Sequence, residues 1–255
     1  MGSEMGLEAI NKAWKSTCKI LLKEEIGDLW DYEAYLSQYM DQKREVVSAI
    51  SGKEISVSPM PFCKESKFIS DNEADEFDKR KRKQKLGINE IKDIDSILEN
   101  IGEICYSGDI IRGNSREVES SDCCFNSSFV YKCTDVYDDK YVAYTCNIRK
   151  SEHLFGCNWG GGSDYLIKCS QVFEQTRCFE TLHTVSISDC YYAANLESCA
   201  NCMFSFNQKS KKNMIGNLQL SIEKYEKLKE KLVGDIREIL EDKKSIQSIE
   251  QIISG

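Results

Sequence analysis

Residues 121–151 read SDCCFNSSFVYKCTDVYDDKYVAYTCNIRKS, and this stretch carries a six-residue repeat. Valine, isoleucine, leucine or cysteine occupies thirteen of the fifteen positions taken at steps of six from Val118 to Cys202. A second column starts three residues later, at Ser121, and twelve of its fifteen positions hold serine, threonine, cysteine or alanine. Because a period of six fits neither the 3.6 residues of a helical turn nor the two-residue alternation of a single strand, the repeat predicts a β-solenoid.

Two coil sizes compete for this repeat. Left-handed hexapeptide helices use three hexads per coil and place the small residue four positions after the aliphatic one. Here that position holds charged residues such as Lys140, Glu152 and Asp164, and charges do not line a narrow core. The observed spacing resembles the twelve-residue, right-handed coil of beetle antifreeze solenoids. We therefore expect a right-handed solenoid with two hexads per coil, about seven coils and a length of about 34 Å.

Helical patterns flank the repeat on both sides. Apolar residues at three- and four-residue spacing predict one helix from Leu7 to Gly27 and a second over 29–39. Ser221 is a predicted N-cap for a charged amphipathic helix, and a short helix through 246–253 follows. The expected fold class is α+β, a β-solenoid flanked by terminal helices. Its predicted parts are a helical region 1–47, an irregular linker 48–104 with a charge block and a short helix over 88–101, the solenoid 105–220, and C-terminal helices 221–255.

The composition excludes several classes of protein. The 255 residues include 34 Lys+Arg and 42 Asp+Glu, which gives a net charge of −8, and the mean hydropathy is −0.46. No apolar run approaches the ~18 residues of a membrane span, so we expect no membrane association. The first residues lack the basic and apolar regions of a secretory signal. We therefore expect a cytoplasmic or virion-associated protein that is not secreted, with its 13 cysteines as thiols.

Most of these cysteines fall on the two inward columns of the repeat. Cys199 and Cys202 form a Cys-x-x-Cys pair, which could supply two of the four ligands of a structural zinc, but no second pair is placed to complete the site. We interpret them as packed core thiols and expect no metal and no cofactor. The eight cysteines on the inward columns are Cys124, Cys133, Cys157, Cys169, Cys178, Cys190, Cys199 and Cys202.

The residues that flank the inward aliphatics predict two outward faces, of which one is strongly aromatic. An aromatic face of this length exceeds what a monomer leaves exposed, so something should cover it. The candidates are the terminal amphipathic helices of the same chain, an identical face of a second copy, or a protein partner. The predicted interaction face comprises Phe129, Tyr131, Tyr141, His153, Phe155, Tyr165, Ile167, Phe179, Tyr191 and Met203.

The chain contains few residues that are suited to catalysis. The two histidines, His153 and His183, fall on opposite faces, whereas a solenoid carbonic anhydrase needs three around its metal. We expect no catalytic residues and favour a non-enzymatic scaffold or protein-interaction module, alone or as an oligomer. An alternative is an enzyme or ligand-binding site between the helices and the solenoid, around His153, Trp159 and Tyr165.

A second alternative is an RNA-binding accessory protein. The chain carries a basic run that follows an acidic stretch, and such a run neutralises phosphates. No aromatic residue is interleaved, so no base-stacking platform is visible, and we favour a solvated linker or exposed helix end as the explanation of the run. The basic residues are Lys79, Arg80, Lys81, Arg82, Lys83 and Lys85.

Residues 121–131 and the exit Cys199-Ala-Asn-Cys202-Met-Phe-Ser-Phe-Asn207 resemble uncharacterised Cys/Asn/Tyr-rich solenoid proteins of archaea, candidate-phyla bacteria and tailed viruses. The resemblance covers roughly residues 115–235. It extends loosely to Ile215-Gly-Asn-Leu218 and to the start of the following helix. Bacterial members often carry an N-terminal zinc ribbon, which this chain lacks, and sometimes a CoA-transferase label, for which it has no acidic nucleophile context. The resemblance implies a solenoid and no established activity.

Overall fold

The computed structural model describes residues 2–40, 44–58, 66–70, 73, 85–153, 155–161, 164–173 and 176–254. Its strands are β1 Arg44–Val47, β2 Glu54–Val57, β3 Lys67–Ile69, β4 Tyr106–Gly108, β5 Ile111–Arg112, β6 Arg116–Glu119, β7 Asp122–Phe125, β8 Ser128–Tyr131, β9 Thr134–Tyr137, β10 Lys140–Ala143, β11 Cys146–Arg149, β12 Asn158–Gly161, β13 Cys169–Phe173, β14 Phe179–Leu182, β15 Tyr191–Glu197, β16 Ala200–Met203, β17 Phe206–Lys209, β18 Lys212–Ile215 and β19 Leu218–Gln219. Its helices, with 3-10 turns marked η, are α1 Gly2–Leu22, η1 Leu29–Tyr32, α2 Glu33–Leu36, η2 Ser37–Tyr39, α4 Ile94–Asn100, η5 Ile101–Glu103, α5 Ile222–Lys243 and α6 Ile249–Ser254.

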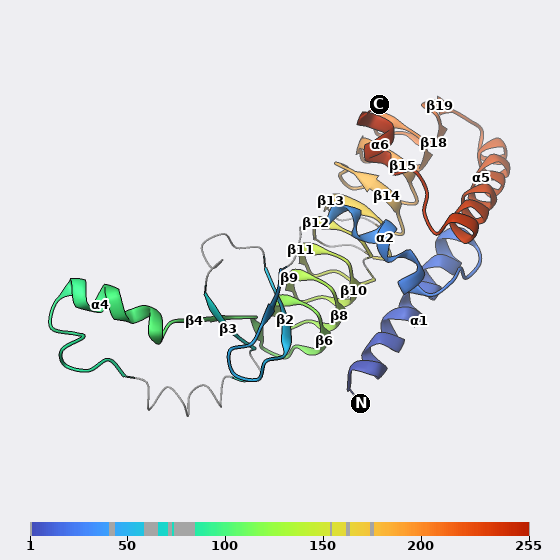
Figure 1. Ribbon diagram of the computed structural model, residues 1–255. Coiled ribbons are helices and arrows are strands. Elements are labelled where there is room, and N and C mark those ends of the chain that lie inside the picture. Colours follow the sequence, from blue (N-terminus) through green and yellow to red (C-terminus); the bar gives the residue numbers. More distant parts are fainter. Residues whose placement is uncertain are drawn as a thin grey trace.

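A β-solenoid of about eight turns forms the centre of the molecule, with helices beside it (Figure 1). Successive turns pair in parallel at a spacing of twelve residues, from Arg116 opposite Ser128 to Ala200 opposite Lys212. The prediction of two hexads per coil is therefore confirmed, and the solenoid has one turn more than the seven expected. At ~4.8 Å per turn, the eight turns make a rod of about 38 Å.

A left-handed backbone conformation recurs at every third residue along two stretches of the solenoid. From Glu117 to His153 the φ angle at every third residue lies between 48° and 65°, and from Arg177 to Asn213 it lies between 47° and 57°. Each such residue directly precedes an inward side chain. The left-handed step interrupts the two-residue alternation of a strand, so side chains can point inward every three residues, four times per turn.

These strained positions suit particular residue types. Asparagine and aspartate tolerate the left-handed region better than other non-glycine residues, because their short polar side chains bond locally. Many of the left-handed residues belong to these two types. At other left-handed residues the backbone N–H forms a hydrogen bond to the neighbouring turn, as when Lys132 N–H donates to Glu119 O at 3.0 Å. The left-handed asparagines and aspartates are Asn126, Asp135, Asp138, Asn147, Asp189, Asn195, Asn201, Asn207 and Asn213.

The solenoid interior is a narrow apolar core in which cysteine substitutes for serine. All eight cysteines predicted to point inward lie in this core at 2% exposure or less, so this prediction is confirmed. Serine hydroxyls at inward positions donate to the carbonyl two residues earlier, as Ser127 Oγ does to Phe125 O at 2.8 Å. Cysteine thiols make the same contact, as Cys178 Sγ does to Thr176 O at 3.3 Å. Burial raises the pKa of the Cys178 thiol to about 12, so it remains a protonated donor.

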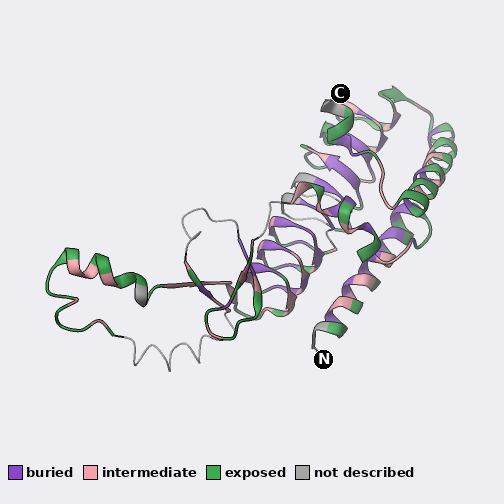
Figure 2. Cartoon of the chain, viewed as in Figure 1, coloured by how far each residue is buried: buried purple, intermediate pink, exposed green. Residues whose placement is uncertain are grey.

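A second apolar core lies outside the solenoid, between its aromatic face and the terminal helices. α1 contacts β6, β8 and β10, α5 contacts α1 and β18, and α6 contacts β14 and β15. Trp14 of α1 meets the ring of Phe155 edge-on at 5.3 Å, and Tyr191 Oη donates to Leu21 O at 3.0 Å. The buried residues of this interface and of the solenoid interior stand out in Figure 2. The Ser221 N-cap of α5 is confirmed, since its hydroxyl accepts from Lys224 N.

The predicted linker 48–104 contains more regular structure than expected. β1 and β2 pair as an antiparallel hairpin, so 44–47, assigned to the helical region, is a strand. β3 and β4 pair in parallel. The segment that leads into β4 contains helix α4, which lies well away from the solenoid (Figure 1). We call residues 85–105 the arm. The predicted helix over 88–101 is shorter than expected, with turns over 88–93 before α4.

The left-handed positions predict a specific pattern of substitution effects. Asn147→Val places a β-branched side chain at φ 56° and should lower the free energy of unfolding by about 1–2 kcal/mol, whereas Asn147→Gly should change it by no more than about 0.5 kcal/mol. Lys140→Val, at an exposed strand position without a positive φ, is the matched control. Urea denaturation measures all three. Equal losses for both valine variants would show that the backbone conformation is not the cause.

Candidate functional site

The predicted aromatic interaction face exists, but the chain's own helices cover most of it. Half of its ten residues are buried at 2% exposure or less in the core beneath α1 and α5, so they are not presented to a partner as expected. The physical reason is that the helices need an apolar surface and the aromatic column supplies one. These five residues are Phe155, Ile167, Phe179, Tyr191 and Met203.

The other five residues of the face are half-buried. Phe129, Tyr131 and Tyr141 pack against the same core. His153 lies beside α1, where its Nδ1 is 3.4 Å from Thr17 Oγ1, and the ring of Tyr165 meets that of His153 edge-on at 5.1 Å. Burial lowers the pKa of His153, so its imidazole is neutral at pH 7. The side chain of Trp159, the third residue of the alternative ligand site, lies outside the described residues.

One column of residues at twelve-residue spacing connects the solenoid to both terminal segments. We call Lys132, Tyr144, Gly156, Lys168, Glu180 and Tyr192 the corner column. At its lower end Lys132 Nζ pairs with Glu33 Oε1 at 2.5 Å, and Tyr144 Oη donates to Glu33 Oε2 at 3.5 Å. At its upper end Tyr192 Oη donates to Gln247 O at 3.2 Å. The segment from η1 to η2 therefore follows the column from turn to turn, and the C-terminal segment continues the contact.

Gly156 permits the closest approach within this column. Its φ is +74°, and a Cβ there would lie 2.3 Å from Leu36 O. Because this neighbour is backbone, it cannot move aside as a flexible side chain could. Glycine is the residue that satisfies both the left-handed conformation and the close approach of α2.

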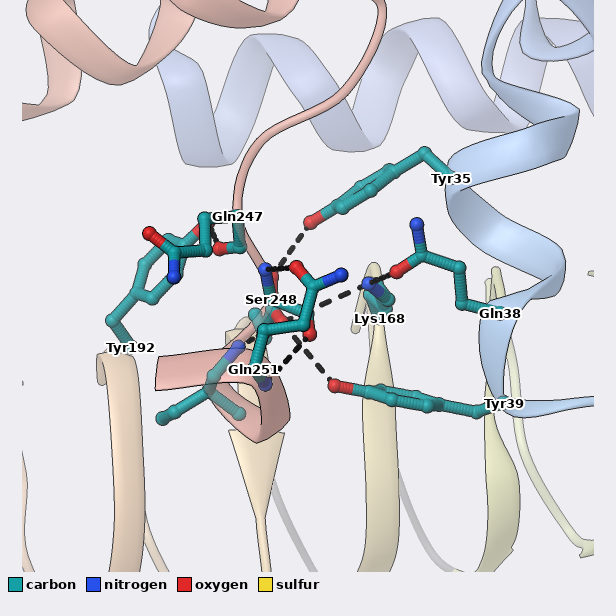
Figure 3. Close-up of polar contacts among 10 residues, drawn as sticks. Tyr35, Gln38, Tyr39, Lys168, Tyr192, Gln247, Ser248 and Gln251 are labelled. Atoms are coloured by element: carbon teal, nitrogen blue, oxygen red, sulfur yellow. Dashed lines mark hydrogen bonds and ion pairs between the residues drawn. The ribbon is translucent and has the colours of Figure 1, made fainter. Parts of the chain in front are cut away.

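Lys168 and Glu180 form a buried charge pair at the middle of the corner column. Figure 3 shows Lys168 with the neighbouring side chains of Tyr35, Gln38 and Tyr39. Their side chains are fully buried, and Lys168 Nζ lies 3.8 Å from Glu180 Oε1. The lysine also donates to Gln38 Oε1 at 2.5 Å and lies 4.2 and 4.7 Å from the ring centres of Tyr35 and Tyr39. Two aromatic faces and an amide oxygen therefore surround the ammonium group, which is favourable for a desolvated cation.

Glu180 accepts hydrogen bonds from both terminal segments. Tyr35 Oη donates to Oε2 at 2.7 Å, and Ile249 N donates to Oε1 at 2.6 Å. Tyr39 Oη adds a longer contact of 3.4 Å. The carboxylate thus connects η1–α2–η2 at one end of the chain to α6 at the other, and we call this group of contacts the clasp.

Burial shifts the titration of both charged groups of the clasp. It lowers the pKa of Lys168 to about 8 and raises the pKa of Glu180 above its ordinary value. A lysine with such a pKa can act as a nucleophile where substrate reaches it. Here the ammonium is fully enclosed by tyrosine rings and an amide, so the arrangement joins segments and offers no reaction centre.

A cavity of about 220 Å³ lies near the first turn of the solenoid, several turns away from the clasp. It is lined by the first turns of α1 and the first turn of the solenoid, including Leu7, Ile10, Glu117 and Glu119. One oxygen of each glutamate is inaccessible to water and has no hydrogen-bond partner among the described residues. Both glutamate side chains are otherwise half-exposed, so the cavity is an open recess at the edge of α1.

The arm carries the most exposed group of large apolar side chains. Ile88 is 78% exposed, and Ile94 and Leu98 are each 65% exposed. Spacings of three and four residues place Ile94, Leu98 and Ile101 on one side of α4 and η5. The sequence predicts a helix here but not that its apolar face is uncovered, because apolar periodicity does not show whether a face is packed. We call Ile88, Ile91, Ile94, Leu98 and Ile101 the arm stripe.

Within the described residues, no group of three or more His, Cys, Asp or Glu is arranged to hold a metal ion. None of the helices in the described ranges has the length and apolar character needed to cross a bilayer. Of the predicted RNA-binding run, residues 79–83 fall outside the described residues, and Lys85 is exposed.

Comparison of the chain with family models, with curated proteins and with solved structures finds no match. The resemblance to hexad-repeat solenoid proteins, like the handedness of the solenoid, therefore stays a prediction.

The clasp predicts a strong contrast between breaking and replacing the charge pair. Glu180→Ala leaves the Lys168 ammonium buried without its carboxylate and Ile249 N–H without its acceptor. It should therefore lower the free energy of unfolding by about 3–5 kcal/mol. Lys168→Met with Glu180→Gln keeps the side-chain volumes and removes both charges. It should lower the free energy of unfolding by no more than about 1–2 kcal/mol. Urea denaturation at pH 7 measures both variants. A loss in the double variant equal to that of Glu180→Ala would contradict the role assigned to the charges.

The same pair predicts how stability depends on pH. Because the folded pKa of Lys168, about 8, lies below the ordinary 10.5, the unfolded chain binds more protons in this window. Stability relative to the Lys168→Met, Glu180→Gln variant should therefore rise by about 3 kcal/mol from pH 8 to 10.5. Glu180 has the opposite shift, so its contribution is greatest below pH 4.5 and is lost as pH rises through its folded pKa. The difference between wild type and double variant should be least favourable near neutral pH, and a flat difference would refute the assignment.

Proposed function

We propose that this protein is a non-enzymatic scaffold whose rigid body presents the arm to a protein partner. The observation that carries the proposal is the arm stripe, five large aliphatic side chains that are 40–78% exposed on a segment lying away from the body. Contiguous exposed apolar groups mark interaction sites more often than isolated ones do. The predicted aromatic face of the solenoid is replaced in this role because the terminal helices already occupy it.

The body has the properties that a scaffold needs. Its interior is packed around the inward columns, and the second core joins both ends of the chain to the solenoid. The clasp fixes the N-terminal and C-terminal segments to the same two turns. The arm leads directly into β4, and β4 pairs in parallel with β3, so the C-terminal end of the arm is anchored in a paired strand.

The arm helix itself favours a role in binding. α4 has good local caps, since the Asp93 carboxylate accepts from Ser96 N at 2.8 Å and Asn100 Nδ2 donates to Ser96 O. Yet α4 spans seven residues, and helices shorter than ~12 residues are marginal without packing. None of its apolar side chains belongs to either of the two cores formed by the described residues. A partner that covers the stripe would supply the missing packing.

The test compares two variants of the full chain, a double variant in the arm and a single control variant in the solenoid. Ile94→Glu with Leu98→Glu removes the centre of the stripe, and Val185→Glu alters an apolar residue of the solenoid that is 47% exposed. Proteins captured from host-cell lysate by wild type are purified and their binding to each variant is measured directly. The arm variant should bind at least ~30-fold more weakly, and Val185→Glu should bind like wild type. Both variants should unfold at the wild-type temperature, and unchanged binding by the arm variant would refute the proposal.

A further inference from the structure

We infer that the arm stripe binds an amphipathic helix whose apolar side is bordered by lysine and arginine. This inference rests on the proposed function and specifies the partner. It begins from the charges around the stripe. Residues 86–102 contain four carboxylates and one lysine, Lys92, which gives a local net charge of −3 (1 − 4). The four carboxylates are those of Glu90, Asp93, Asp95 and Glu99.

These carboxylates lie between the stripe residues along the chain, so they border the apolar surface. Asp93, Asp95 and Glu99 are exposed. Asp93 is the N-cap of α4, and its hydrogen bond with Ser96 N lowers the pKa of its carboxyl. A partner seated on Ile94 and Leu98 would therefore meet negative charge at the edge of the contact. Opposite charges at the rim steer association and discriminate between partners.

The same charges disfavour two other occupants. In a pair formed by two copies of the arm, the carboxylates of one stripe would lie against those of the other, and like charges oppose such pairing. An anionic membrane surface would repel the acidic rim, whereas helices that lie on membranes carry Lys and Arg on their polar face. A basic amphipathic helix satisfies both the apolar stripe and its border.

The extent of the stripe is suited to a helical partner of moderate affinity. Three of its residues, Ile94, Leu98 and Ile101, lie on α4 and η5 at spacings of four and three, which a partner helix can match with side chains at i, i+3, i+4 and i+7. Such a contact is smaller than a standard protein–protein interface. We therefore expect reversible binding with a Kd in the micromolar range.

Two synthetic helical peptides of about 20 residues test the inference with the full chain. Both carry the same leucine stripe, one bordered by lysine and the other by glutamate, and fluorescence anisotropy measures binding of each. The lysine-bordered peptide should bind at least ~10-fold more tightly, and raising the salt concentration should narrow the gap. Asp95→Lys with Glu99→Lys should reverse the preference, and Ile94→Glu with Leu98→Glu should abolish binding of both peptides.

A control variant tests whether the basic run before the arm affects the binding of the peptides. The measurement is repeated in a chain carrying Lys79→Gln, Arg80→Gln, Lys81→Gln, Arg82→Gln and Lys83→Gln, in which the preference for the lysine-bordered peptide should persist. Equal binding of the two peptides, or no binding of either at millimolar concentration, would overturn the inference. The inference would also be overturned if the wild-type chain formed a dimer that the Ile94→Glu, Leu98→Glu variant did not form. Flotation of the chain with phosphatidylserine vesicles would overturn it as well. The scaffold proposal is judged separately, by the capture experiment.

Discussion

The twelve-residue register between turns is the constraint on which the rest of the structure depends. Each residue of the solenoid lies beside the residue twelve positions earlier, and parallel backbone ladders hold this spacing from β6 to β18. The ladders also offset an unusual cost. The left-handed residues that recur at every third position over 117–153 and 177–213 are unfavourable by themselves, and they persist because the turns above and below leave them no alternative. A shift of one residue would move every inward side chain off its column.

The register also converts single residues into columns with a shared environment. Inward columns gather cysteine and serine, which differ in polarity but donate to the backbone in the same way. The corner column instead brings Lys168 directly beside Glu180 in the next turn. Neither charge could be buried alone, because each would lack the partner that offsets its loss of water. The clasp therefore requires both the repeat spacing and the two terminal segments that enclose it.

The sequence revealed the features that repeat, and it concealed those that depend on contacts between distant residues. Hexad spacing was enough to predict the coil size and the burial of eight cysteines, and a serine before an amphipathic run was enough to place the N-cap of α5. The left-handed positions are harder to recognise from the sequence. Asparagine and aspartate recur there at three-residue intervals, but lysine, tyrosine and phenylalanine occupy other positions of the same series and weaken the pattern. No sequence pattern marks Lys168 and Glu180 as a buried pair, because their partners Gln38 and Tyr35 lie 130 and 145 residues away in sequence.

The way the solenoid uses its aromatic face explains why a binding element would lie outside the repeat. In a stacked repeat, a side chain that suits one turn recurs in the next, so a face becomes apolar along its whole length and attracts the helices of its own chain. A surface meant for another molecule must escape this intramolecular cover. The arm achieves that, because it joins the body at β4 and holds its own apolar stripe away from the solenoid. Its acidic border has the same sign as the net charge of −8 on the whole chain, so the long-range field and the local contact would favour the same basic partner.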